Sequence, residues 1–246
     1  MTVGIIVQCR TGSSRLPAKV MMKADDEFLM IDYVINQLKH SKLHDEIVVA
    51  TTNLKQDDVI FDYVTNRNIP CFRGDEKNVL ERHYQCAKKY AFSTIVRIPS
   101  DKPLIDPTIV DSVIEKFSSS KFDFVANCGL SKKNNELVLN STYPSGTEVE
   151  MFSFDALETV WKNVTTSDER EHVTPYIYLH PEKFKIHTIN LLKDFSDFRW
   201  ALDYESDMKL IREIISRIKN RPILMNDIIS LLENNPKLKE INRINH

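Results

Sequence analysis

Short apolar stretches alternate with segments of helical periodicity over the first half of the chain. The apolar stretches are rich in β-branched residues and too short for helices, so they predict buried strands over 3–7, 46–51, 69–72, 93–98 and 122–126. Between them, apolar residues recur at helical spacing and predict helices over 29–38, 57–67, 78–92 and 107–117, the last capped by Asp106. Such alternation with short connections indicates an α/β fold, in which a mostly parallel sheet is sandwiched by helices.

The rhythm changes after residue 126. Residues 129–147 are mostly polar, and we expect the chain over 127–150 to leave the sheet as an extended or hairpin-like excursion. We expect no second domain, so that residues 1–246 form one domain. Beyond the excursion, the pattern predicts helices over 154–160, 169–179, 206–218 and 226–232, extended segments over 184–191 and 198–202, and a frayed charged tail.

Composition narrows the class of protein. At 246 residues, with 42% hydrophobic and 28% charged residues, the chain has the make-up of one large soluble domain. Its formal net charge of -2 argues against a nucleic-acid binder. No apolar run is long enough to cross a bilayer, and the start of the chain has no signal-peptide pattern, so no membrane partner is expected. The four cysteines show no metal-site or C-x-x-C spacing, and we expect reduced thiols in a cytoplasmic protein: Cys9, Cys71, Cys86 and Cys128.

The first predicted strand runs directly into a loop of small and basic residues. Arg10, Arg15, Lys19 and Lys23 lie within the first 24 residues, which contain no Asp or Glu. A strand that opens into such a loop is typical of phosphate binding, because backbone N–H groups and cationic side chains can surround the anion. An exposed loop with scattered basic residues is the alternative. The coincidence of cations, Gly12 and a strand end favours a polyphosphate site, although neither a P-loop nor a dinucleotide fingerprint is present.

The stretch Cys-Arg-Thr-Gly-Ser-Ser-Arg-Leu-Pro-Ala-Lys over 9–19 resembles the A-R-x-G-S-x-R-L-P-x-K signature of sugar-activating cytidylyltransferases. That group includes the enzymes charging acylneuraminate and 3-deoxy-manno-octulosonate, and the spore-coat-polysaccharide (SpsF-type) family. Cys9 departs from the usual Ala, a change of one small residue for another. The resemblance implies a nucleotide-diphosphosugar-transferase-like fold. It also implies nucleotide contacts from the strand end and the loop: Gln8, Cys9, Arg10, Gly12, Ser13, Arg15 and Lys19.

Asp101 is a candidate metal ligand. It follows a predicted strand, and ligands gather at the carboxyl ends of parallel strands, where a carboxylate facing a triphosphate can hold Mg²⁺. Asp101 could equally cap the turn before Pro103. The stretch 97–105 resembles the family's R-x-x-G-D-x-P-L-I, whose Asp binds the metal. Ser100 stands in place of Gly, and Lys102 stands where relatives often have a small residue, which adds a cation beside Asp101.

A second candidate metal ligand lies near the C-terminus. Arg-Trp-Ala-Leu-Asp-Tyr-Glu-Ser-Asp over 199–207 resembles the family's R-W-T-x-D-T-x-E-D, with Tyr204 in place of Thr. The resemblance implies that Asp203 supplies a second metal carboxylate. Asp203 or Ser206 could instead cap the helix that follows, and for Ser206 we expect the cap.

The family's F-R-G…V-L-x-R frame is intact over 72–82. The resemblance implies nucleotide contacts from Arg73, Gly74 and Asn78, together with Ser100 and Asp101 of the metal motif. The amide of Asn78 could hydrogen-bond the nucleotide, but Asn78 could equally be an ordinary helix N-cap.

The segments 143–150 and 169–174 resemble the family's acceptor-binding segments. The resemblance implies acceptor contacts from Thr147, Glu148, Arg170 and His172. Arg170 suits an acceptor carboxylate because its planar fork matches that geometry. His172 could be a base, a hydrogen-bond donor or a structural residue.

The resemblance spans nearly the whole chain and implies a reaction. CMP would pass from CTP to an acidic, nonulosonic-acid-like sugar with release of pyrophosphate, for surface polysaccharide or glycan synthesis. 3-Deoxy-manno-octulosonate or a small phosphorylated acceptor is the alternative substrate. The implied catalytic residues are Arg10, Arg15, Lys19, Asp101 and Asp203, with Mg²⁺ as the cofactor.

Two alternative functions can be tested against the same residues, and the resemblance also implies a state of assembly. A glycosyltransferase usually needs D-x-D, and position 103 is Pro. A non-catalytic nucleotide-binding module would be favoured by loss of Asp101 or Asp203, and both are present. The family is usually dimeric through the middle excursion, so a homodimer is expected.

Overall fold

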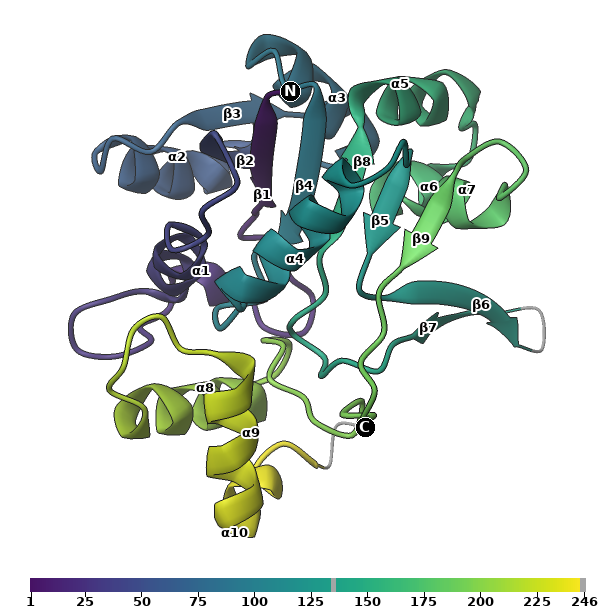
Figure 1. Cartoon of the computed structure of the whole chain (residues 1–246). Coiled ribbons are helices and arrows are strands. Elements are labelled where there is room, and N and C mark those ends of the chain that lie inside the picture. The colour runs from purple at the N-terminus through teal and green to yellow at the C-terminus, as the bar shows by residue number, and fades with distance from the viewer. Residues whose placement is uncertain (134–135, 244–246) are drawn as a thin grey trace.

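The computed structural model describes residues 1–133 and 136–243. One seven-stranded sheet runs in the order β3-β2-β1-β4-β8-β5-β9 (Figure 1). Its neighbouring strands are parallel except where β8 pairs antiparallel with β4 and β5. The strands are β1 (Val3–Gln8), β2 (Glu46–Thr52), β3 (Cys71–Gly74), β4 (Thr94–Pro99), β5 (Phe124–Ala126), β8 (Glu150–Ser153) and β9 (Ile186–Thr188).

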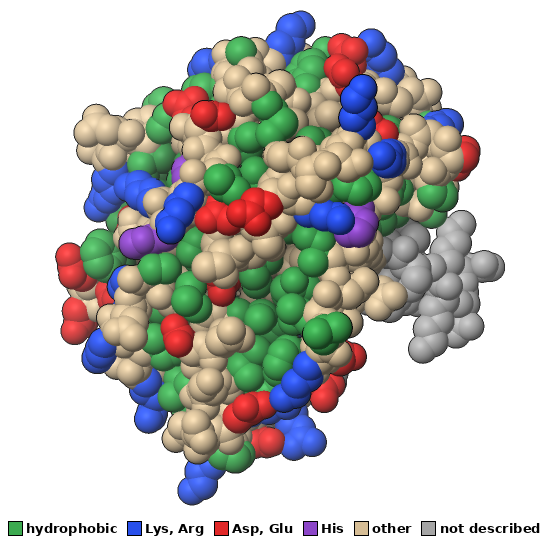
Figure 2. All heavy atoms as spheres, in the orientation of Figure 1, with side chains coloured by type: hydrophobic (Ala, Val, Ile, Leu, Met, Phe, Trp, Pro, Cys, Tyr) green, Lys and Arg blue, Asp and Glu red, His purple; other side chains and the backbone are tan. Residues whose placement is uncertain are grey.

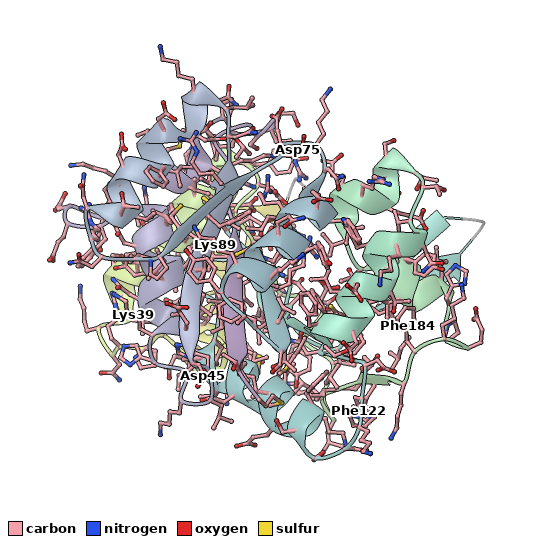
Figure 3. The ribbon with its side chains drawn as sticks, turned by 90° about the horizontal axis from the view of Figure 1, so that it is seen from above. Lys39, Asp45, Asp75, Lys89, Phe122 and Phe184 are labelled. Carbon is pink, nitrogen blue, oxygen red and sulfur yellow. The ribbon has the colours of Figure 1, made fainter. Side chains whose placement is uncertain are left out.

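Helices cover both faces of the sheet, because alternate strand residues point to opposite sides. Ile5 and Val7 belong to a buried cluster that includes residues of α1 (Met30–Leu38), α2 (Asp58–Thr65), α4 (Pro107–Ser118), α8 (Glu205–Arg217) and α9 (Met225–Asn234). Ile6 belongs to a second cluster, which includes residues of α3 (Val79–Lys89), α5 (Phe154–Asn163) and α7 (Pro175–Leu179). In the view from above, Asp75, which follows β3, and Phe122, which precedes β5, lie at opposite edges of the molecule (Figure 3). The remaining helices are α6 (Ser167–His172) and α10 (Pro236–Lys239), and two short 3-10 turns are η1 (Lys19–Met21) and η2 (Lys55–Asp57).

The α/β class predicted from the sequence is confirmed, and Asp106 caps α4 as predicted by accepting a hydrogen bond from the Thr108 amide at 2.7 Å. The hairpin-like excursion is also present. β6 (Gly129–Lys133) pairs antiparallel with β7 (Glu136–Asn140) outside the main sheet, and projects to one side of the molecule (Figure 1).

The sequence pattern missed β8, the antiparallel strand at the centre of one half of the sheet. Its first residue, Glu150, falls at the end of the predicted excursion. β8 is four residues long, and Met151 and Phe152 are both buried because each packs against one of the two helical layers. A strand this short and buried on both faces has neither alternation nor length to distinguish it.

Two other predictions differ from the structure, the helix over 169–179 and the cap at Ser206. The helix expected over 169–179 is interrupted at Val173, which has a φ of 71°, and Pro175 then starts α7. The segment 198–202, expected to be extended, forms one isolated bridge, between Ser145 and Arg199, and is not part of a named strand. The predicted cap at Ser206 is wrong, because α8 begins at Glu205 with Tyr204 as its N-cap residue.

Candidate active site

The strand order reverses between β1 and β4. From β1 the sheet continues through β2 to β3, and from β4 it continues in the opposite direction through β8 and β5 to β9. In open α/β sheets, ligands bind beyond the carboxyl ends of the strands at such a reversal. β1 ends at Gln8 beside Pro99 of β4, and the Ser100 amide donates to the Gln8 carbonyl at 3.0 Å. The predicted phosphate loop and the predicted metal loop therefore leave the sheet side by side.

A buried carboxylate, that of Asp57, holds the predicted phosphate loop at Thr11. The amide and the hydroxyl of Thr11 both donate to Oδ1 of Asp57, at 2.7 and 2.6 Å, and the Thr52 hydroxyl also donates to Asp57. The Ala18 amide closes the loop on the Thr11 carbonyl at 2.9 Å. Sequence reasoning placed Asp57 only at a helix start, and its position one residue before α2 gave no sign of this anchoring contact.

Asp203 gathers three cations at the mouth of this loop. Its Oδ1 lies 2.9 Å from Arg15 and 3.0 Å from Lys19, and its Oδ2 lies 2.6 Å from Arg199. Burial alone would raise the pKa of Asp203, but Lys19, Arg199 and Arg15 lower it below its usual range. Three of the predicted catalytic residues thus meet in one cluster, and Arg199 joins them although the sequence singled out only its motif.

Asp101 lies against the same segment. The Leu202 amide donates to the Asp101 carbonyl at 2.8 Å, while the carboxylate Oδ1 of Asp101 is buried without a hydrogen-bond partner. Buried polar atoms in native proteins almost always have a partner. A buried carboxylate oxygen without one, such as Oδ1 of Asp101, is therefore suited to contact a cation.

These carboxylates fit a magnesium ion that is shared with substrate phosphates. Within the described residues there is no cluster of three or more His, Cys, Asp or Glu side chains that could hold a metal by itself. Mg²⁺ is commonly held by one or two carboxylates, with phosphate oxygens and water completing its shell. The carboxylates of Asp101 and Asp203 would supply that donor set.

Lys102, expected to add a cation beside Asp101, is paired instead. Its ammonium donates to the carbonyl of Glu148 at 2.8 Å and lies 3.1 Å from the carboxylate of Glu148. Burial would raise the pKa of Glu148, but Lys102 and the Gly146 amide lower it. The neighbouring Thr147 is fully buried and donates its hydroxyl to Pro144 at 2.8 Å. Acceptor contacts from Glu148 and Thr147 stay predictions.

The predicted nucleotide residues at the end of β3 make contacts within the protein. The Arg73 guanidinium donates to the carbonyls of Thr52 and Leu54, at 2.8 and 2.9 Å, and pairs with Asp58 at 2.6 Å. Asn78 is the N-cap of α3 and accepts from the Glu81 amide at 3.0 Å, which is the alternative expected from the sequence.

A buried arginine was missed beside these residues. Arg82 is fully buried and donates to the Asp75 carbonyl at 2.8 Å, and a Cβ on Gly74 would lie 2.9 Å from its Cγ. Gly74 therefore makes room for Arg82. In the sequence, Arg82 was marked only as the final residue of the V-L-x-R frame, which did not indicate that it is buried.

Arg10 points away from the Asp203 cluster toward α6. Its guanidinium lies 3.2 Å from Glu171 and donates weakly to the Glu76 carbonyl at 3.5 Å. On the same helix, Arg170 donates to the Val164 carbonyl at 3.0 Å, and His172 lies 3.5 Å from Asp168 with 58% of its side chain exposed. The structure thus places α6 beside the loop, and the acceptor roles of Arg170 and His172 stay predictions.

The remaining loop residues are distributed around the strand end. Gln8 accepts from Arg97 at 3.1 Å, and Arg97 pairs with Glu150 at 2.6 Å. Burial raises the pKa of Cys9 to about 12, so its thiol is not a nucleophile. Ser13 accepts a long hydrogen bond from the Leu16 amide at 3.4 Å. Ser100 is buried beneath the loop, and Gly12 would meet ordinary contacts at 3.4 Å if it carried a Cβ.

The fold and the site define a nucleotidyltransferase, with a cationic loop at the strand reversal and two carboxylates opposite it. Known proteins specify the kind. A cytidylyltransferase family model matches residues 4–240. This chain belongs to that family and is a CTP-dependent nucleotidyltransferase.

Similarity to known proteins extends over nearly the whole chain. An uncharacterised protein of Methanocaldococcus jannaschii is 38% identical over 240 residues, covering 96% of this chain and 93% of that protein. The spore coat polysaccharide biosynthesis protein SpsF of Bacillus subtilis is 26% identical over 239 residues, covering 94% of each. The solved structure of a cytidylyltransferase from Leptospira borgpetersenii superposes with a TM-score of 0.88 at 30% identity, covering 97% of this chain and 96% of that one.

Proposed function

We propose that this enzyme transfers CMP from CTP to an acidic sugar and releases pyrophosphate. The observation that carries the proposal is the pairing of Asp203 with Arg15, Lys19 and Arg199, next to the unpartnered carboxylate oxygen of Asp101. Arg15 and Lys19, which already lie against this carboxylate, are suited to receive the more highly charged triphosphate.

The chemistry requires positioning and charge neutralisation rather than a covalent nucleophile. The acceptor hydroxyl gives up its proton to water as its oxygen bonds to the α-phosphorus. The bond from that phosphorus to the bridging oxygen of the β-phosphate breaks, and its electron pair leaves with pyrophosphate. Arg15 and Lys19 would hold the β- and γ-phosphates that leave, and Arg10 would turn from Glu171 to join them. Asp101 and Asp203 would hold Mg²⁺, which supplies charge neutralisation at the α-phosphate.

The acidic acceptor is supported by resemblance and by the basic residues of α6. The enzymes charging acylneuraminate and 3-deoxy-manno-octulosonate share the motifs of this chain, and Arg170 and His172 lie on the helix that contacts Arg10 through Glu171. Arg170 would turn from the Val164 carbonyl to the acceptor carboxylate. A small phosphorylated acceptor is the alternative that the same cations would bind.

Assembly and location belong to the same proposal. The β6–β7 hairpin stands outside the main sheet, where it is available to pair with a second copy in a homodimer. A cytoplasmic location agrees with the four free cysteines. Among the described residues, no helix has the length and apolar character to span a membrane.

The experiment that tests the proposal is a screen for pyrophosphate release from CTP and Mg²⁺ over sugar acids and small phosphates. We expect release with a sugar acid, and its loss in Asp101→Asn. Asp111→Asn is the matched control. Asp111 lies on α4, away from the two candidate metal carboxylates, and accepts hydrogen bonds from Ser41 and Lys42. Release with phosphorylated acceptors but with no sugar acid would contradict the acidic-sugar assignment.

A further inference from the structure

A turn over 143–148 contacts both segments that carry the candidate metal carboxylates. Its backbone pairs with the segment before Asp203, since the Ser145 amide donates to Phe198 at 2.9 Å and the Trp200 amide donates back to Ser145 at 2.8 Å. Gly146 has a φ of 105°, and a Cβ there would lie 2.7 Å from the Ala201 amide nitrogen. The turn is therefore pressed directly onto the segment 198–202.

Arg199 fastens one end of the turn to Asp203. One terminal nitrogen donates to the Ser145 hydroxyl at 3.0 Å, and the other donates to Oδ2 of Asp203 at 2.6 Å. Asp207, which is fully buried, accepts from the Asp203 amide at 3.0 Å and so holds the same residue from behind. The planar fork of arginine can serve two acceptors at once in a fixed geometry, which lysine cannot.

Lys102 fastens the other end of the turn to the segment of Asp101. Its ammonium contacts both the carbonyl and the carboxylate of Glu148, and that carboxylate also accepts from the Gly146 amide at 3.0 Å. Lys102 and Glu148 are each 9% exposed. A buried ion pair such as this contributes little net stability compared with apolar residues, but it fixes the relative position of the two segments.

We propose that Arg199 and Lys102 are positioning residues, which use the turn 143–148 as a brace to hold Asp101 and Asp203 at the separation that the metal-bound nucleotide requires. The inference rests on the proposed function, because it takes the two carboxylates as the metal ligands. Neighbours that orient metal ligands are commonly worth tenfold or more in metal affinity. The brace therefore acts on metal binding and leaves the phosphate contacts of Arg15 and Lys19 in place.

The test measures two affinities that need no acceptor. Mn²⁺ binding in the presence of CTP is followed by electron paramagnetic resonance, and CTP binding without metal is followed by calorimetry. For Arg199→Lys we expect the Mn²⁺ affinity to fall by about tenfold or more, with metal-free CTP affinity changed by less than about threefold. Arg212→Lys is the matched control, because Arg212 donates to the Lys23 carbonyl from α8 without touching either carboxylate.

A second variant keeps the test independent of Arg199. Lys102→Met with Glu148→Gln removes both charges together, so that neither is left buried alone, and the same loss of Mn²⁺ affinity is expected. Unchanged Mn²⁺ affinity in both variants would overturn the brace. An equal loss of metal-free CTP affinity in Arg199→Lys would also overturn it, since Arg199 would then bind phosphate. Absence of Mn²⁺ binding by the unaltered protein with CTP would contradict the proposed function itself, and the brace with it.

Discussion

At the scale of single residues, the site is governed by which carboxylate faces which cation. Asp203 is surrounded by Arg15, Lys19 and Arg199, while one oxygen of Asp101 has no partner. Charge-assisted contacts order the cations before the nucleotide arrives. The unpartnered oxygen of Asp101 would be available to a metal ion.

If both carboxylates serve one ion, their loss should not be multiplicative. Asp101→Asn and Asp203→Asn should each reduce single-turnover release of pyrophosphate by roughly three orders of magnitude, because each removes a charged ligand. The double variant should be far less impaired than the product of the two single losses. Multiplicative losses would mean that the two residues act separately.

Stability should respond to pH through Asp203. Because the folded-state pKa of Asp203 is lowered, its contribution is present above the ordinary value of 3.8 and is lost as the pH falls through the folded value. At neutral pH, Asp203→Asn should cost about 2 kcal/mol, with the share of the half-exposed Arg15 reduced by solvent screening.

Thermal unfolding of the two proteins from neutral pH down to about pH 3 checks this linkage. The difference in melting temperature should shrink below about pH 4. A difference that stays constant with pH would show that the ion pairs of Asp203 do not stabilise the fold. Asp101→Asn should have little effect on melting, because the carboxylate oxygen it replaces has no partner to lose.

At the scale of elements, the sequence was most informative where periodicity and turn chemistry agree. Asp106 followed by Pro107 marked the start of α4, and the apolar runs marked β1, β2 and β4. The sequence was least informative where tertiary contacts decide. β8 owes its place to pairing with β4 and β5, and the brace depends on Lys102 meeting Glu148, which are far apart in the chain.

The turn 143–148 should not tolerate a side chain at Gly146. Gly146→Ala places a Cβ against the backbone of Trp200 and Ala201 at a positive φ, so we expect a loss of about 2 kcal/mol or more in the free energy of unfolding. Gly129→Ala is the control, since its nearest Cβ contact is 3.7 Å. Equal unfolding free energies in chemical denaturation would show that the turn yields without cost.

At the scale of the whole molecule, the near-neutral charge is also spread evenly over the visible surface. Basic and acidic side chains are interspersed over the described part of the face in Figure 2, with no broad surface of one sign. α8, α9 and α10 lie together below the sheet, past the end of β1 (Figure 1). The sequence motifs predicted which segments meet at the candidate active site. The partners of Arg10, Arg73 and Lys102 depend on tertiary packing, which no local sequence pattern encodes.

The β6–β7 hairpin should carry the dimer. Light scattering of the full chain should give the mass of two copies, because the hairpin offers strand edges outside the main sheet. Deletion of the hairpin should reduce the mass to that of one copy. A full chain that is already monomeric, or a deletion variant that still dimerises, would remove the hairpin from the interface.

We expect the site to select CTP over the other nucleoside triphosphates. Calorimetric titration with CTP, UTP, ATP and GTP in the presence of Mg²⁺ tests it most directly, because it needs no knowledge of the acceptor. We expect CTP to bind at least about tenfold more tightly than each of the others, a difference of about 1.4 kcal/mol. Equal affinity for a purine triphosphate would contradict the assignment.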